Sequence, residues 1–146
     1  MRNQNGFTLL EVLVTLLIVS LGLLGIAGII ANSLKVNQGA YARTQASWVA
    51  SDIIDRMRAN RVTAEVSPSP YAMANCAAAP AGTAVAALDL RNWCAELVAA
   101  LPSGTGDGTV TMAAASPWNV TVVVRWDDSH AQGAASTQTF TVETRL

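Results

Sequence analysis

The hydrophobic pattern of the chain begins with one long apolar segment. From Phe7 to Ala31 the sequence runs for 25 residues with a single charge, Glu11. As a helix this segment is about 37 Å long, and the hydrocarbon core of a membrane is about 30 Å thick. Arg2 and the free amine precede it, which favours a cytoplasmic N-terminus and an exported C-terminus. We therefore expect residues 7–31 to form a membrane-spanning helix.

Apolar positions continue beyond this segment with a helical period. Polar residues such as Ser47, Ser51 and Asp55 fall towards the other side, and Asp52 lies one turn before Arg56, so the two side chains can pair. We expect residues 32–60 to form the amphipathic second half of the same helix and one wall of a globular head. The apolar positions that carry this prediction are Ala42, Ala46, Val49, Ile53 and Met57.

The head, residues 61–146, starts with a segment that lacks periodicity. Residues 61–88 are rich in Ala, Pro, Ser and Thr and are expected to be a loop. Asp89 is a good N-cap for a short helix over 89–101, which Pro102 and Gly104 would end. The apolar stripe of this helix consists of Leu90, Trp93, Cys94, Leu97, Val98 and Leu101.

The last third of the chain alternates with a period of two. Strands are expected over about 108–113, 118–126 and 137–145, the last two joined by a polar loop. A small antiparallel sheet with one apolar face and a helix with an apolar stripe make an α+β head. The expected fold class is thus α+β, with a long N-terminal helix packed on a small antiparallel sheet.

Composition narrows the class of protein. The 146 residues have room for one domain, and the net charge of −1, without a run of Lys or Arg, argues against a nucleic-acid partner. Cys76 and Cys94 both lie outside the apolar segment. An even pair in a chain that looks exported suggests one disulfide, and two buried free thiols are the alternative. If the bond forms, it pins the expected loop to the short helix and contributes roughly 3 kcal/mol.

The sequence offers few candidate catalytic or metal-binding residues. The one histidine, His130, follows Asp127 and Asp128 in a polar turn, and this arrangement favours a solvated hairpin over a metal site. Cys94 would need a basic partner to act as a nucleophile, and only the distant His130 offers one. We expect no enzyme, no metal and no cofactor.

Glu11 separates three interpretations of the apolar segment. A carboxylate at membrane depth costs on the order of 2.5–3.5 kcal/mol and usually marks a function. A secretory signal peptide would have a shorter apolar stretch without an acid, followed by a small-residue cleavage site such as Gly25-Ile26-Ala27. A plain membrane anchor fits the length but gives no reason for Glu11. A third interpretation supplies a partner for this carboxylate.

The stretch Gly6-Phe7-Thr8-Leu9-Leu10-Glu11-Val12 resembles the processing motif of type IV prepilins and of type II secretion pseudopilins. The resemblance implies that residues 1–6 are a leader, that a prepilin peptidase cuts after Gly6, and that Phe7 is then N-methylated. It also implies that Glu11 is an assembly carboxylate, which meets the Phe7 amine of a neighbouring subunit inside a filament. Pairing would offset the burial of two charges that neither group could bear alone.

Further patches narrow this resemblance to minor pilins of the PilV type. These patches are Ala40–Ala46, Asp52, Asp55–Asn60, Asp89-Leu90, Trp93, Leu101–Gly106 and Val110. The resemblance implies a subunit of a priming or tip complex in type IV pilus assembly, with roles in adhesion and twitching motility. A minor pseudopilin of a type II secretion system is one alternative. A single-pass membrane protein with a periplasmic binding head is another.

The implied partners are other minor pilins, the main pilus subunit, the prepilin peptidase and an inner-membrane assembly platform. The implied location is the inner membrane, with a cytoplasmic N-terminus and a periplasmic head, and then the pilus. The neighbouring subunits, retention in the surface pilus, an adhesive ligand and the strand order of the head stay open at this stage.

Overall fold

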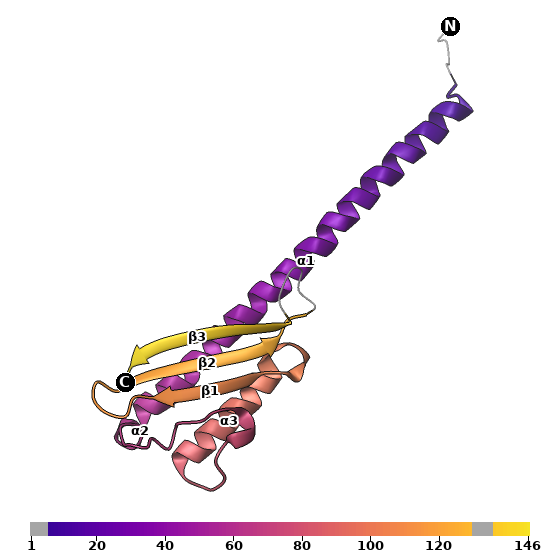
Figure 1. The fold of residues 1–146 in the computed structure, drawn as a ribbon. Coiled ribbons are helices and arrows are strands. Elements are labelled where there is room, and N and C mark those ends of the chain that lie inside the picture. The colour runs from indigo at the N-terminus through magenta and orange to yellow at the C-terminus, as the bar shows by residue number, and fades with distance from the viewer. Residues whose placement is uncertain (1–5, 130–135) are drawn as a thin grey trace.

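A computed structural model describes residues 6–129 and 136–146. A 51-residue helix, α1 (Leu9–Ala59), runs the length of the molecule, and its second half packs against a small head (Figure 1). The head contains α2 (Arg61–Ala64), α3 (Val85–Ala100), two short 3-10 turns, η1 (Cys76–Ala78) and η2 (Pro102–Gly104), and three strands. This arrangement confirms the expected α+β class.

The sheet has the order β1-β2-β3 and is antiparallel throughout. Its strands are β1 (Asp107–Met112), β2 (Asn119–Asp127) and β3 (Thr137–Arg145). Pairing is one-to-one along both ladders, from Asp107 opposite Arg125 in the first and from Asn119 opposite Arg145 in the second. The three strands lie within one residue of the expected bounds, and consecutive strands are neighbours, which the sequence left open.

Side chains along β2 alternate between the two faces of the sheet, and one of these faces is buried. Four alternate side chains of this strand face the helices and are buried: Val120, Val122, Val124 and Trp126. The core lies between this face, the second half of α1 and the inner side of α3 (Figure 1). The apolar positions predicted along α1, from Ala42 to Met57, are all buried in it.

The predicted start of the short helix is wrong. Helix α3 begins at Val85, and its N-cap residue is Ala84, which makes no side-chain cap bond. Asp89 lies inside the helix, where its carboxylate accepts a hydrogen bond from the Tyr71 hydroxyl at 2.6 Å and is not available to cap. The first turn forms because Ala favours helix and because Ala86 and Ala87 are buried against the core.

Two details of the head also differ from the expectation. The segment 61–88 is not only loop, since it contains α2, η1 and the first turn of α3. Within it, Met73 pairs with Val110 of β1 through two backbone hydrogen bonds of 2.9 and 2.8 Å, so this segment covers part of the outer edge of β1. Val98, predicted in the apolar stripe of α3, is 47% exposed.

Candidate functional site

The candidate site is the start of α1, where Thr8 ends the extended chain and caps the helix. The Thr8 hydroxyl accepts a hydrogen bond from the backbone N–H of Glu11 at 3.3 Å. Thr8 and Glu11 are thus the N-cap and N3 residues of a capping-box sequence, Ser/Thr-x-x-Glu/Gln, a local signal that the sequence analysis missed. The positive end of the helix dipole also stabilises the negative charge of Glu11 in the first turn.

The Glu11 carboxylate remains available in this arrangement. Glu11 is exposed, and within residues 6–129 and 136–146 no hydrogen bond or ion pair to its side chain occurs. Phe7, four residues before it, is 83% exposed. Cutting after Gly6 would create a new terminus at Phe7. This terminus and the Glu11 carboxylate lie about one helical turn apart, and both are open to another molecule.

From Val12 to Ala31 the helix is apolar apart from Thr15 and Ser20. The Thr15 hydroxyl donates to the Glu11 carbonyl at 2.9 Å, and the Ser20 hydroxyl donates to the Leu16 carbonyl at 2.6 Å. These internal bonds satisfy both hydroxyls, which is what a helix in lipid requires. Within the part of the chain that the structure describes, α1 is the one helix long and apolar enough to cross a membrane.

The head holds the second half of α1 through charged and polar contacts with α3. The Arg56 guanidinium bonds Asp52 of α1 and Glu96 of α3, each at 2.6 Å. Burial works to lower the pKa of Arg56, but the hydrogen bonds to Glu96 and Asp52 outweigh it and raise the pKa. The pairing of Asp52 with Arg56 was predicted from their spacing, whereas the reach to Glu96 across the helices was not.

Tyr71, in the segment before η1, also lies at the contact between α1 and α3. The side chain is fully buried, and its hydroxyl donates to Asp89 and accepts from the Asn60 amide at 3.1 Å. Burial, helped by the hydrogen bond to Asp89, raises the pKa of Tyr71 to about 12. A tyrosine in a segment without periodicity gave no sequence signal for this role.

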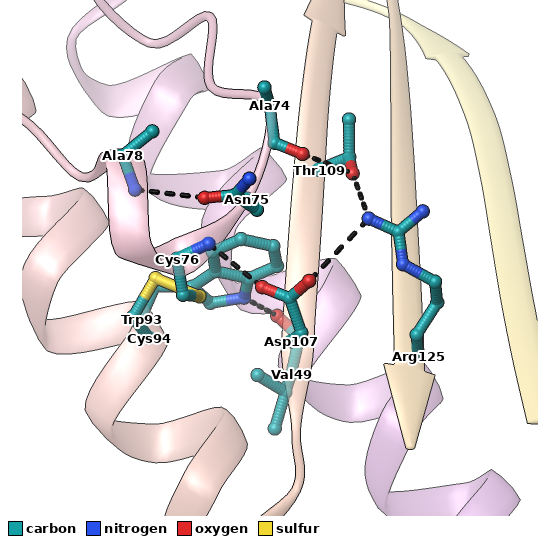
Figure 2. The surroundings of a disulfide bond; sticks show 10 residues. All are labelled: Val49, Ala74, Asn75, Cys76, Ala78, Trp93, Cys94, Asp107, Thr109 and Arg125. Carbon is teal, nitrogen blue, oxygen red and sulfur yellow. Dashed lines mark hydrogen bonds and ion pairs between the residues drawn. A yellow bond between two sulfur atoms is a disulfide. The ribbon is translucent and has the colours of Figure 1, made fainter. Parts of the chain in front are cut away.

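A disulfide joins Cys76 of η1 to Cys94 of α3, with their Cα atoms 5.6 Å apart (Figure 2). Asp107 at the start of β1 supports the same segment, because its carboxylate accepts the Cys76 N–H at 2.8 Å and lies 3.6 Å from Arg125 of β2. Arg125 also donates to the Thr109 hydroxyl, which donates to the Ala74 carbonyl (Figure 2). These contacts fix the segment around residues 74–78 on the head.

The remaining candidates from the sequence do not gather at this site. The cysteines lie in the head and the motif lies at the far end of α1 (Figure 1). His130 lies outside the described residues. The Asp127 carboxylate, three residues earlier in the sequence, accepts the Ser129 N–H at 2.9 Å in a local turn.

The comparisons with known proteins bear on the N-terminal site. Residues 1–27 match the family model described as the prokaryotic N-terminal methylation motif. No curated protein and no solved structure matches the chain. The matched segment contains Gly6, Phe7 and Glu11, and the fold joined to it is a long helix on a small antiparallel sheet. Together the motif and the fold support a type IV pilin-like protein that prepilin peptidase processes.

Proposed function

We propose that this chain is a minor pilin of the PilV type. Prepilin peptidase cuts it after Gly6, Phe7 is N-methylated, and the subunit joins other minor pilins in a complex that primes or caps a type IV pilus. Before assembly it sits in the inner membrane with its head in the periplasm. We assign it no enzymatic role. The matched methylation motif, the exposed apolar half of α1 and the disulfide in the head support this proposal.

One observation carries the proposal, namely the free Glu11 carboxylate one turn from Phe7. Cutting after Gly6 leaves a cationic amine on Phe7, and the amine of a neighbouring subunit is a partner of the right charge for Glu11. The two groups would stabilise each other in an apolar filament core, where each alone is costly. Assembly is then oligomerisation through α1, with head contacts added outside the membrane.

The presence of Glu11 also bears on position in the complex. A subunit at the extreme tip has no neighbour above it whose amine could meet the carboxylate. Because this chain keeps Glu11, we place it below another minor pilin and not at the top.

The experiment is Glu11→Gln in cells that assemble pili. The variant is expected to insert and to be cut, because the carboxylate lies beyond the cleavage point. It is then expected to lose its partner pilins on co-purification, since an amide cannot neutralise a buried ammonium. The loss is about 3–5 kcal/mol, as for one member of a buried ion pair. Glu65→Gln, which removes a head carboxylate that pairs with Arg61, is the matched control.

Three results would contradict the proposal. Normal recovery of partner pilins and normal surface piliation with Glu11→Gln would show that this carboxylate does not dock the subunit. Recovery of secretion pseudopilins in place of pilins with the unaltered chain would assign it to a type II secretion system. An uncut N-terminus with full tolerance of Glu11→Gln would instead indicate a single-pass membrane protein with a binding head.

A further inference from the structure

The peptide bond at which prepilin peptidase is proposed to cut lies outside α1. This bond joins Gly6 to Phe7, and the helix begins only at Leu9. Thr8, which precedes the helix, has extended backbone angles, with φ −79° and ψ 150°. Within residues 6–129 and 136–146, no hydrogen bond to the Gly6 carbonyl oxygen occurs, and the first carbonyl that accepts bonds from the helix is that of Thr8. The carbonyl of the bond to be cut is therefore not tied into the helix.

The Thr8 side chain fixes the start of the helix at this point. Its hydroxyl oxygen accepts the Glu11 N–H at 3.3 Å, and its carbonyl oxygen accepts the N–H groups of Glu11 and Val12 at 3.1 and 3.3 Å. Other hydroxyls in this half of α1 act differently, because those of Thr15 and Ser20 donate to carbonyl oxygens within the helix. Thr8 thus provides the acceptor that a helix needs for its first backbone N–H groups.

Without this cap the helix would extend towards the leader. Apolar surroundings penalise backbone N–H groups that lack an acceptor, so a helix in lipid lengthens until a polar residue can cap it. Asn5 is the next residue upstream of a type that caps helices well. A helix capped there would begin at Gly6, and the Leu10 N–H would bond the Gly6 carbonyl oxygen. The bond between Gly6 and Phe7 would then lie in the first turn.

Cutting requires access to the Gly6 carbonyl group. In the hydrolysis, the oxygen of a water molecule bonds to the carbonyl carbon, the C–N bond to Phe7 breaks, and a proton passes to the Phe7 nitrogen. This leaves a carboxylate on Gly6 and the amine on Phe7. An enzyme stabilises the negative charge that develops on the carbonyl oxygen with its own donors, and a helical hydrogen bond to that oxygen would block them. The extended chain before Thr8 leaves the oxygen open.

The fold itself does not require glycine at position 6. A Cβ atom on Gly6 would meet no atom within 4 Å other than its chain neighbours, and Gly6 does not have a positive φ. The demand for glycine that the motif implies therefore has to come from the enzyme that holds this bond. The chain accordingly presents the leader side of the bond open to the peptidase.

We infer that Thr8 is a positioning residue for prepilin peptidase, because its cap holds the bond between Gly6 and Phe7 out of α1. The inference rests on the proposed function and names a residue that sets the rate of processing. It also separates processing from assembly. Thr8 uses the backbone N–H of Glu11, while the Glu11 carboxylate stays available for the Phe7 amine of a neighbour. Loss of the Thr8 cap is thus expected to slow cutting, and Glu11→Gln is expected to affect docking alone.

The direct test measures kcat/KM for leader release from the full chain, reconstituted in lipid and mixed with purified prepilin peptidase. Thr8→Val keeps a branched side chain of similar size but removes the acceptor, and it is expected to lower kcat/KM about fivefold, the typical effect of a lost N-cap. Thr8→Ser and Thr8→Asn, which cap well with side chains of different shape, should retain most of the rate. Thr15→Val, at the next threonine of α1, is the matched control and should be cut like the unaltered chain.

A second measurement, hydrogen exchange at the Leu10 amide of the uncut chain without enzyme, shows whether α1 has lengthened. In Thr8→Val this amide should exchange more slowly than in the unaltered chain, because it gains the Gly6 carbonyl oxygen as an acceptor. In Thr8→Asn its exchange should stay unchanged.

Equal cutting of Thr8→Val and the unaltered chain would overturn the inference. Slow cutting of Thr8→Asn, or slow cutting of Thr8→Val with unchanged exchange at Leu10, would also overturn it, since the enzyme would then contact the Thr8 side chain directly. These results would leave the proposed function standing. Failure of the peptidase to cut the unaltered chain would refute both.

Discussion

Trp93 of α3 donates its indole N–H to the backbone carbonyl oxygen of Val49 in α1, at 2.8 Å. This buried bond ties the two helices together at the centre of the head (Figure 2). The far side of the same indole ring lies against Gly108 of β1, where a Cβ atom would collide with the ring and with Leu97. The width of Trp93 therefore sets how closely β1 approaches α3, and only glycine fits at position 108.

Gly108→Ala is accordingly expected to destabilise the head. Neither the Trp93 ring nor the strand can move without disturbing the bond to Val49 or the ladder with β2, so the cost is about 1–3 kcal/mol, as for other overpacked cores. Chemical denaturation of the solubilised full chain measures it. Thr111→Ala, an exposed change on the same strand, is the control and is expected to have little effect. An unchanged unfolding free energy for Gly108→Ala would contradict the packing described here.

The disulfide is expected to stabilise the head and not to bind a partner. Cys76 and Cys94 are 18 residues apart, and closing a loop of this length is worth about 3 kcal/mol in the chain-entropy model. Cys76→Ser should therefore lower the unfolding free energy and the protein level in cells, while folded protein still recovers its partners. A reductant should lower the stability of the unaltered chain to that of the variant and leave the variant unchanged. Two reactive thiols in the denatured, unreduced chain would refute the bond.

Tyr71→Phe is expected to loosen the junction of α1, α3 and the segment between them. The change removes the hydroxyl that donates to Asp89 and accepts from Asn60. Because buried polar groups then lose their partners, the free energy of unfolding is expected to fall by about 1–3 kcal/mol. Denaturation at pH 8 measures this loss. Tyr41→Phe, which alters an exposed tyrosine on α1, is the matched control and should leave stability unchanged.

The same tyrosine predicts a response to alkaline pH. In the folded chain the pKa of Tyr71 is raised to about 12, from about 10 in an unfolded chain. The folded state therefore holds this proton more tightly, and the stabilisation is complete below about pH 10 and is lost as the pH rises through about 12. The stability difference between the unaltered chain and Tyr71→Phe should shrink over this range. A constant difference from pH 8 to pH 12 would contradict the assignment.

Periodicity predicted those parts of the fold that bury one regular face. The helix up to Ala59 and the alternation of β2 followed from it, because each buries apolar residues at a fixed spacing. The start of α3 did not follow, since Asp89 has the local chemistry of a cap and its use by Tyr71 depends on a contact across 18 residues. Tyr71 itself could not be found, because nothing near it in sequence shows which loop residue the core will bury.

The candidate site at the start of α1 could be named from a local motif, whereas the contacts within the head could not. Gly6, Phe7 and Glu11 form a local motif, so their spacing is visible without the fold. Periodicity places Trp93 on the apolar stripe of its helix and Trp48 off the stripe of α1, but it does not show the contact between the two helices. Trp48 and Trp93 both lie in helices, and the contact that buries Trp93 and leaves Trp48 exposed comes from how α3 crosses α1.

The mass of the N-terminal peptide, taken from protein in isolated membranes and in sheared pili, tests the central claim most directly. Processing by prepilin peptidase predicts a chain that starts at Phe7 with one added methyl group on its amine. Gly6→Val, which places a bulky residue at the junction, should retain residues 1–6 and stay in the membrane. Unaltered protein that keeps Met1 to Gly6 in assembled pili would contradict processing at this site and, with it, the pairing proposed for Glu11.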